Sequence, residues 1–306
     1  MSHCNFGKGS AIFLLPYYHE PRTDIHEEFD RKTTSSIEDY FENYFGRQVI
    51  VTPNGRTAIS VILESLGLNP DDEVYITTTF EKPNISSCVT CTIFNFCRPS
   101  RVLTDKTKVI FVIHEFGVPH PRMDDLATLA KQNSLPLIED CAHTIDSRRN
   151  GKMVGKIGDY MICSFPKIFP VQYGGLLIGE NLTYEPTAIQ SKIIDQVRCI
   201  LPKYMSSIKE YSNKKRANFQ SLQAKFERIS LKPLYELNED ISPSFHFPLV
   251  TDKFEKVIEK ASQSGIDCGL WHGTNIVVFP VHQFLEEEHL ERIFEVVKSV
   301  YEVGID

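Results

Sequence analysis

The feature that most constrains the fold of this chain is an alternation of strand-like and helix-like segments across residues 48–178. Short runs rich in β-branched and aromatic residues alternate with segments whose apolar residues recur at helical spacing. The strand-like runs are 48–52, 73–78, 108–113, 135–138, 160–165 and 175–178, and the helix-like segments are 35–45, 57–66, 84–90 and 123–132. This alternation predicts an α/β fold, with helices on both faces of a sheet.

The pattern changes after about residue 181. Long helical patterns cover 188–201 and 205–229, and a block of two short strands, 246–250 and 275–279, follows with helices at 254–264 and 286–303. A chain of 306 residues is long enough for two domains. We therefore expect a large domain over 1–185 and a small α+β C-terminal domain over 186–306.

Composition and charge exclude several classes of protein. Hydrophobic residues make up 42% and charged residues 24%, as in ordinary globular proteins. The net charge of −7 argues against a nucleic-acid partner. No apolar run approaches the ~18 residues that span a bilayer, and the N-terminus lacks the pattern of a secretory signal. We expect a cytoplasmic protein with no membrane partner.

The eight cysteines are scattered along the chain, which predicts reduced thiols rather than a disulfide framework. Cys88 and Cys91 have the spacing of a redox motif, but no second CxxC completes a zinc site. His246 and His282 have no carboxylate or second histidine at ligand spacing. We therefore expect no metal.

Asp140 follows an apolar run and precedes small residues, in Leu137-Ile138-Glu139-Asp140-Cys141-Ala142-His143. Ligands of open α/β sheets lie beyond the C-terminal ends of strands, where a carboxylate can pair with a protonated ring nitrogen. The alternative is a helix N-cap. From this stretch alone both interpretations remain, and the cap is the more ordinary one.

Lys167 is flanked by apolar residues, in Pro166-Lys167-Ile168-Phe169-Pro170-Val171. Desolvation lowers the pKa of a lysine, and a neutral amine can attack a carbonyl to form a Schiff base. The alternative is a lysine whose stem packs while its head reaches water.

Two further features could bind an anion. Gly55 lies in a turn that opens a helix, where free N–H groups and the helix dipole favour negative charge. Ser164, near the end of a strand, could donate to an anion or to a local backbone partner. The glycines at 151, 155 and 158 predict turns, including a hairpin. Neither a Walker motif nor a GxGxxG motif is present.

In this order along the chain, the residues resemble the DegT/DnrJ-type, pyridoxal-phosphate-dependent nucleotide-sugar aminotransferases, a fold-type I group. The motifs that carry the resemblance are Tyr44-Phe45-Gly46, Asn54-Gly55-Arg56-Thr57-Ala58-Ile59, Asp72-Glu73-Val74, Phe116-Gly117, Ile138-Glu139-Asp140-Cys141-Ala142-His143, Val154-Gly155-Lys156-Ile157-Gly158-Asp159, Ser164-Phe165, Lys167 and Gly174-Gly175. They cover roughly residues 35–180. The resemblance implies a mixed, mostly parallel sheet in the large domain and pyridoxal 5'-phosphate (PLP) as cofactor.

The resemblance also implies roles for single residues. Lys167 matches the Schiff-base lysine, and Asp140 matches the acid that pairs with the pyridinium nitrogen. His143 matches the residue that contacts the ring hydroxyl, and Phe80 matches the aromatic that stacks on the ring. The remaining matches are phosphate contacts from Ser164 and from the backbone of Gly55, Arg56 and Thr57.

The activity that follows from the resemblance is transfer of an amino group from an amino acid, glutamate in many relatives, to a nucleotide-linked keto-sugar by a homodimer. Such a step belongs to polysaccharide biosynthesis. The chain is shorter than most members and has no recognisable NYR motif, which in relatives supplies a phosphate contact from the partner subunit. The alternative is a catalytically degenerate member that acts as a binding or regulatory protein. Sugar dehydration is a third interpretation, and Lys167 argues against it.

Overall fold

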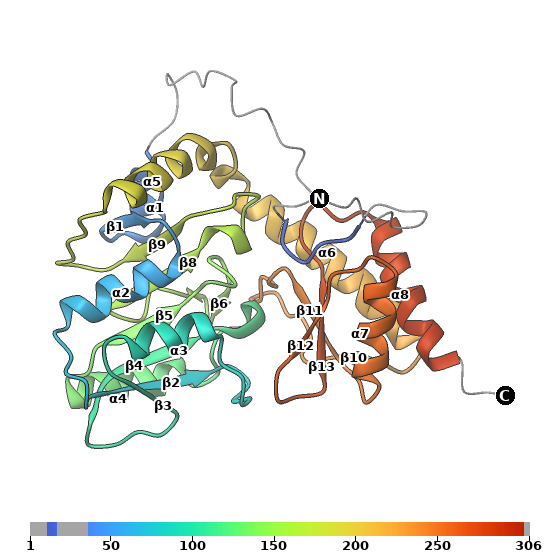
Figure 1. The fold of residues 1–306 in the computed structure, drawn as a ribbon, viewed down its shortest axis with the longest axis horizontal. Coiled ribbons are helices and arrows are strands. Elements are labelled where there is room, and N and C mark those ends of the chain that lie inside the picture. Colours follow the sequence, from blue (N-terminus) through green and yellow to red (C-terminus); the bar gives the residue numbers. More distant parts are fainter. Residues whose placement is uncertain (1–10, 17–35, 303–306) are drawn as a thin grey trace.

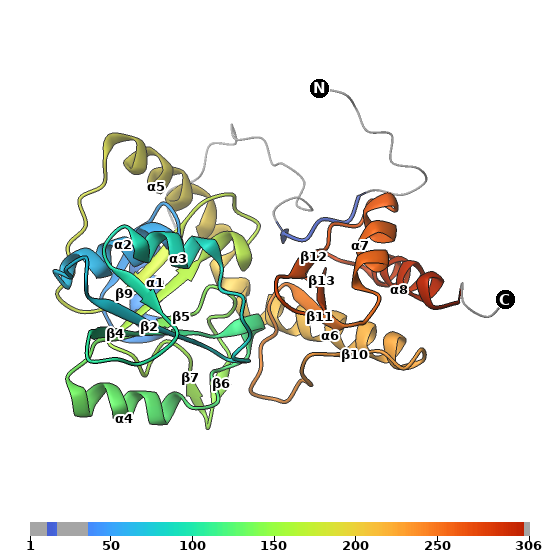
Figure 2. The same cartoon turned by 60° about the horizontal axis from the view of Figure 1, so that its bottom comes forward.

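The computed structural model describes residues 11–16 and 36–302 of the 306-residue chain, and shows two lobes joined through one long helix (Figure 1). The larger lobe contains a seven-stranded sheet, and the smaller lobe contains a four-stranded sheet covered by helices. A turned view keeps the two lobes side by side (Figure 2). The α/β class expected from the alternating segments is confirmed.

The large sheet has the strand order β1-β9-β8-β5-β4-β2-β3. Its strands are β1 (Val49–Thr52), β2 (Glu73–Thr78), β3 (Arg98–Ser100), β4 (Thr107–Ile113), β5 (Leu137–Asp140), β8 (Tyr160–Ser164) and β9 (Gly175–Ile178). Only β9 runs against its two neighbours, so the sheet is mixed and mostly parallel. The C-terminal ends of β1, β2, β4, β5 and β8 therefore meet at one edge, where β9 begins.

Helices cover both faces of this sheet. The α2 (Gly55–Ser65) and α3 (Ser87–Phe94) helices pack into one apolar cluster with β2, β4 and β5. On the other face lie α1 (Ile37–Phe45), α4 (Met123–Asn133) and α5 (Ala188–Ile200). The α1 helix begins after Ser36, whose side chain accepts from the Asp39 N–H at 3.0 Å, and ends at Gly46 with φ 73°. Serine and glycine are common residues at these two ends of a helix.

The boundary at residue 185 remains a prediction, and the contacts of α5 bear on it. Ile194 and Val197 of α5 pack in the same apolar cluster as Phe41 of α1 and Val51 of β1. That cluster continues to Ile208, the first residue of the long α6 helix (Ile208–Glu227). These contacts favour a boundary within α6, because amphipathic α5 completes the core of the large sheet.

The small lobe contains an antiparallel sheet of order β10-β11-β13-β12. Its elements are β10 (Lys232–Pro233), β11 (His246–Val250), β12 (Gly269–Trp271), β13 (Ile276–Pro280), α7 (Phe254–Gln263) and α8 (Glu287–Glu302), with α6 packed alongside. The expected α+β pattern is confirmed. Glu287, in the first turn of α8, pairs with Lys225 of α6 at 2.9 Å, so this acidic side chain joins two helices of the small lobe.

Three local expectations can be compared with the structure. The turn-rich stretch forms a hairpin of β6 (Arg148–Arg149) and β7 (Lys152–Met153), as expected. The described cysteines are free thiols, and Cys4 lies outside the described residues. Across the described ranges, no helix is both long and apolar enough to cross a membrane.

Candidate functional site

Lys167 and Asp140 lie near each other at the edge where the parallel strands end. Asp140 is the last residue of β5, which pairs with β8, and Lys167 ends the short 3₁₀ helix Phe165–Lys167 that follows β8. Asp140 is 5% exposed, and its Oδ1 accepts from the Ala142 N–H at 2.9 Å. Burial raises the pKa of Asp140, whereas the charge of Lys167 opposes that rise. The lysine is thus close enough to interact with a buried carboxylate.

The alternative interpretation of Asp140 as a helix N-cap is wrong. Residues 141–147 form turns and bends, and no helix begins there. The bond from the Ala142 N–H orients the Asp140 carboxylate, whose second oxygen has no hydrogen-bond partner among the described residues.

Glu139, the neighbouring carboxylate, has a different environment because successive side chains of a strand point to opposite faces. Its Oε2 accepts from His114 Nε2 at 3.0 Å and from the Gly155 N–H at 2.9 Å. Its Oε1 accepts from the N–H groups of Ile157 and Gly158 at 2.8 and 2.6 Å. Glu139 therefore organises the glycine-rich loop that precedes β8.

Electrostatics agree with this structural role of Glu139. Burial raises the pKa of Glu139, but the hydrogen bond and charge of His114 and the N–H groups of Gly158 and Gly155 outweigh it, and the pKa is lowered overall. His114 Nδ1 accepts from the His120 N–H at 3.0 Å, which assigns the ring proton to Nε2. The acidic side chain thus stays ionised in a buried position.

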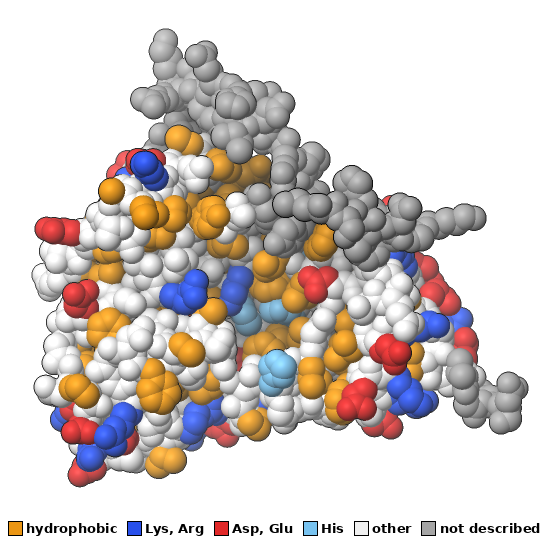
Figure 3. All heavy atoms as spheres, viewed as in Figure 1, with side chains coloured by type: hydrophobic (Ala, Val, Ile, Leu, Met, Phe, Trp, Pro, Cys, Tyr) orange, Lys and Arg blue, Asp and Glu red, His pale blue; other side chains and the backbone are white. Residues whose placement is uncertain are grey.

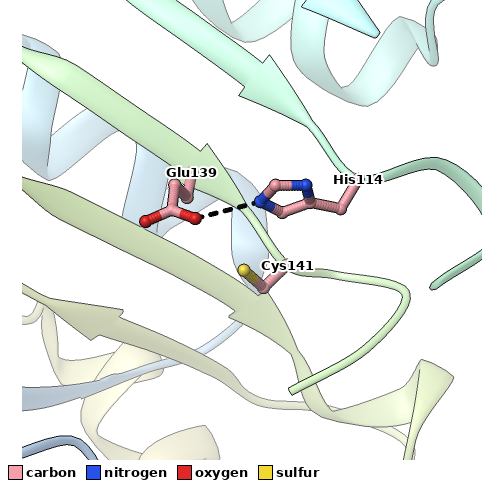
Figure 4. A group of neighbouring side chains, drawn as sticks. All are labelled: His114, Glu139 and Cys141. Carbon is pink, nitrogen blue, oxygen red and sulfur yellow. Dashed lines mark hydrogen bonds and ion pairs between the residues drawn. The ribbon is translucent and has the colours of Figure 1, made fainter. Parts of the chain in front are cut away.

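His114, Glu139 and Cys141 have ligand atoms within 4.8 Å of one another (Figure 4). Each oxygen of Glu139 already accepts two hydrogen bonds. Both ring nitrogens of His114 are already hydrogen-bonded to protein groups. Burial raises the pKa of the Cys141 thiol far above its usual range, which keeps it protonated. This donor set suits a hydrogen-bonded support for β5 rather than a metal centre.

His120 is joined to this hydrogen-bonded group through its backbone N–H, which donates to His114. It is fully buried, and its Nδ1 accepts from the Arg122 N–H at 3.1 Å while Nε2 lies 3.0 Å from Thr77 Oγ1. Burial, aided by the charges of His114 and Arg122, lowers the pKa of His120 to about 4.

Replacing His120 with glutamine is expected to flatten the acid dependence of stability. Because the folded pKa lies below the ordinary 6.5, stability from neutral His120 is complete above pH 6.5 and is lost as pH falls toward 4. The loss amounts to about 3 kcal/mol over that window. Urea unfolding at several pH values measures it. The same exchange at exposed His272 serves as control, and an unchanged slope in His120→Gln would contradict the assignment.

His143 is also buried, 9% exposed, and its ring orientation is fixed by the backbone. Its Nδ1 accepts from the Phe116 N–H at 3.0 Å, so Nε2 carries the proton as a donor. Burial and the charge of Lys167 lower the pKa of His143 well below its usual value. Phe116 has φ 55°, and its carbonyl accepts from Tyr235 Oη at 3.1 Å, which joins this turn to the small lobe.

Aromatic side chains from both lobes surround these polar groups. The ring centroid of Phe116 lies 4.7 Å from that of Trp271 and 6.1 Å from that of Phe80. The His246 ring is 5.2 Å from the His143 ring, and burial and the charge of Lys167 lower the pKa of His246 to about 3. Trp271 Nε1 is buried without a hydrogen-bond partner among the described residues. Figure 3 shows histidine, cationic and hydrophobic side chains gathered in a hollow between the lobes.

Gly55 and Ser164, two residues of the expected anion site, lie beside each other. A Cβ placed on Gly55 would lie 3.6 Å from Ser164 Cβ, so the start of α2 adjoins the end of β8. The Thr57 N–H, expected to contact an anion, instead donates to Asn54 Oδ1 at 3.0 Å. The first-turn N–H groups of Gly55 and Arg56 therefore remain the better candidates. A Cβ on Gly175 would lie 2.7 Å from Gly55 N, which requires glycine there.

The structure thus brings the sequence-predicted residues to one edge of the sheet, and it adds residues that the sequence did not indicate. His246 and Trp271 come from the small lobe, more than 70 positions after Lys167. From the sequence alone, His246 is weighed only as a metal ligand. No local motif marks such residues, because their proximity arises from the contact between lobes.

Solved structures share this fold. An aminotransferase TlmJ from Streptoalloteichus hindustanus has a TM-score of 0.73 at 17% identity, over 87% of this chain and 90% of that chain. A sugar aminotransferase structure from Streptococcus pneumoniae in its PLP-form has a TM-score of 0.73 at 15% identity, over 88% and 91%. The fold is that of fold-type I PLP-dependent transferases.

The family resemblance is confirmed by sequence comparison. Residues 98–181 match the sequence model of the DegT/DnrJ/EryC1/StrS aminotransferase family. GDP-perosamine synthase of Escherichia coli O157:H7 is 28% identical over 55% of this chain and 54% of that protein. The pleiotropic regulatory protein of Geobacillus stearothermophilus is 32% identical over 53% of this chain and 46% of that protein. The matched segment spans about half the length of these curated relatives.

Proposed function

We propose that this protein is a PLP-dependent aminotransferase that transfers an amino group from an amino acid, glutamate by preference, to a nucleotide-linked keto-sugar. The observation that carries the proposal is that buried Asp140 ends β5 and Lys167 follows the neighbouring parallel strand β8, at the C-terminal edge of the sheet. Named relatives such as GDP-perosamine synthase support the substrate class.

The described residues fit PLP. The cofactor carries a cationic ring nitrogen, a ring hydroxyl, an aldehyde and a phosphate, and the site presents a matching group for each. Asp140 offers a buried carboxylate oxygen, His143 offers an Nε2–H donor, and Lys167 offers an amine. Ser164 beside the start of α2 offers donors for phosphate. When bound, PLP supplies an electron sink that stabilises negative charge on the substrate Cα.

Each residue has a distinct task in this proposal. Lys167 binds the aldehyde covalently and, when released, moves the proton at the substrate Cα. Asp140 holds the proton on the ring nitrogen, since a neighbouring cation favours the ionised carboxylate that burial alone disfavours. His143, kept neutral by burial, donates from Nε2 to the ring hydroxyl oxygen. Phe80 stacks on the ring, and small-lobe residues such as Trp271 exclude water.

The wider context is part of the same proposal. We place the enzyme in the cytoplasm as a homodimer that serves polysaccharide biosynthesis. Its partners are small molecules, an amino-acid donor and a keto-sugar acceptor.

A second candidate function is a binding or regulatory protein that keeps the fold without turnover. It is favoured by the similarity to a pleiotropic regulatory protein and by the absence of a recognisable partner-subunit phosphate motif. Under this proposal the protein binds PLP weakly or not at all and does not react with glutamate.

A spectral titration separates the two candidates. Adding PLP to the purified protein is expected to produce a visible absorption band of lysine-bound cofactor, and glutamate is then expected to bleach it. Asp140→Asn should slow the bleaching by about 10²-fold or more, because a neutral amide cannot hold the charge on the ring nitrogen. Asp124→Asn, on the exposed face of α4, serves as control. A band that glutamate never bleaches supports the regulatory candidate. The absence of any band contradicts both proposed roles of Lys167, covalent binding of the aldehyde and proton transfer.

A further inference from the structure

A second lysine, Lys215 of α6, is buried near the site and has no role in the proposed reaction. Its side chain is 2% exposed. Its neighbours on the helix have protein partners: Lys214 pairs with Glu286 at 3.4 Å, and Arg216 donates to the Asn238 carbonyl at 2.7 Å. In the part of the chain that the structure describes, Lys215 Nζ forms no hydrogen bond and no ion pair.

The turn of α6 that carries Lys215 is fixed against the segment that follows β5. Ser212, one turn earlier, accepts from Ser242 Oγ at 2.8 Å, and the Ser242 N–H donates to Ser147 Oγ at 2.8 Å. Ser147 lies four residues after His143. The lysine therefore projects from a helix that is anchored beside the cofactor-contact residues.

Electrostatic effects locate the Lys215 amine relative to the site. Its charge lowers the pKa of His143 and of Cys163, the residue before Ser164, and the charge of Lys167 acts on the same two groups. Burial lowers the pKa of Lys215 itself, and the charges of Asp146 and Cys163 oppose this. Asp146 is the acidic group that faces it, yet it lies beyond ion-pair distance among the described contacts.

An unpaired amine in a buried position is destabilising for the protein alone, because desolvation is not offset by a counter-ion. A ligand oxyanion that enters the site would supply the missing partner. Lysine binds phosphate and carboxylate groups as a compact charge with three donors.

We propose that Lys215 binds an oxyanion of the ligand that occupies the Lys167 site. This inference rests on the proposed function, since PLP and the amino-acid donor supply the candidate oxyanions, a phosphate and a carboxylate. Lys215 contributes this contact from the same chain, where the sequence shows no recognisable motif for a partner-subunit phosphate contact.

The decisive variant is Lys215→Met, which keeps the length of the side chain and removes the charge. Lys214→Met, one position away on the same helix and only partly buried, is the matched control. For each protein we would measure the melting temperature with and without inorganic phosphate, the dissociation constants of PLP and of pyridoxal, and the glutamate concentration that half-bleaches the visible band.

Lys215→Met should melt at a higher temperature than the wild type without ligand and should lose the stabilisation by inorganic phosphate. If the oxyanion is the cofactor phosphate, PLP binding weakens about 10-fold or more while pyridoxal binding is unchanged. If it is the donor carboxylate, PLP binding is kept and the half-bleaching glutamate concentration rises about 10-fold or more.

The inference is overturned if Lys215→Met leaves three quantities unchanged: the dissociation constant of PLP, the half-bleaching glutamate concentration and the stabilisation by inorganic phosphate. This holds whatever the melting temperature of the variant without ligand. Failure of the proposed function is a separate result, seen as a wild-type protein that gives no visible band. In that case the phosphate-dependent melting of the wild type, Lys215→Met and Lys214→Met still decides whether Lys215 binds an oxyanion.

Discussion

Lys167→Ala is expected to abolish the visible band that PLP gives with the wild-type protein. Alanine has no amine to attack the aldehyde, so only non-covalent binding remains. Conversion of glutamate should fall by about 10²–10⁴-fold from the lost proton transfer alone. Absorption spectra and single-turnover rates with glutamate measure the two effects.

The matched control for Lys167→Ala is Lys152→Ala, an exposed lysine in the β6–β7 hairpin. The control should keep the band and the rate of the wild type. A band of equal intensity in Lys167→Ala would show that another lysine holds the cofactor. Buried Lys215 would then be the first candidate, since its charge acts on the same histidine.

Strands and helices of the large lobe were predictable wherever local signals agreed with tertiary packing. The run 73–78 became β2 and the run 175–178 became β9 with the predicted bounds, because buried apolar residues and flanking turns coincide there. The short strands β3 and β12 were not predicted. Each has three residues, and its identity depends on pairing with β2 or β13 rather than on its own composition.

The site was predictable in part, because its residues lie at strand ends that local sequence signals mark. Asp140 and Ser164 end strands and Lys167 follows one, and the ends of parallel strands meet at one edge of a sheet. The different roles of Glu139 and Asp140 were not predictable from the sequence, where they are simply two adjacent acidic residues. It depends on which face of β5 each side chain takes and on the loop that wraps around Glu139.

Glu139→Ala is expected to be the most destabilising single substitution near the site. It would leave three backbone N–H groups and His114 without their acceptor in a buried place, at a cost of about 3–5 kcal/mol. The free energy of unfolding in urea at pH 7 measures the loss. Glu64→Ala, on the exposed face of α2, should change stability by less than about 0.5 kcal/mol.

Glu139→Gln separates the charge of the carboxylate from its shape. Glutamine keeps one oxygen for two of the N–H donors, so its stability should lie between those of the wild type and Glu139→Ala. Because the folded pKa of Glu139 is lowered below the ordinary 4.5, the advantage of glutamate over glutamine should be constant above pH 4.5 and shrink as pH falls below it. An advantage that instead falls as pH rises above 4.5 would mean that Glu139 is held as a neutral acid, and the interpretation of Glu139 as a charged support of β5 would have to be abandoned.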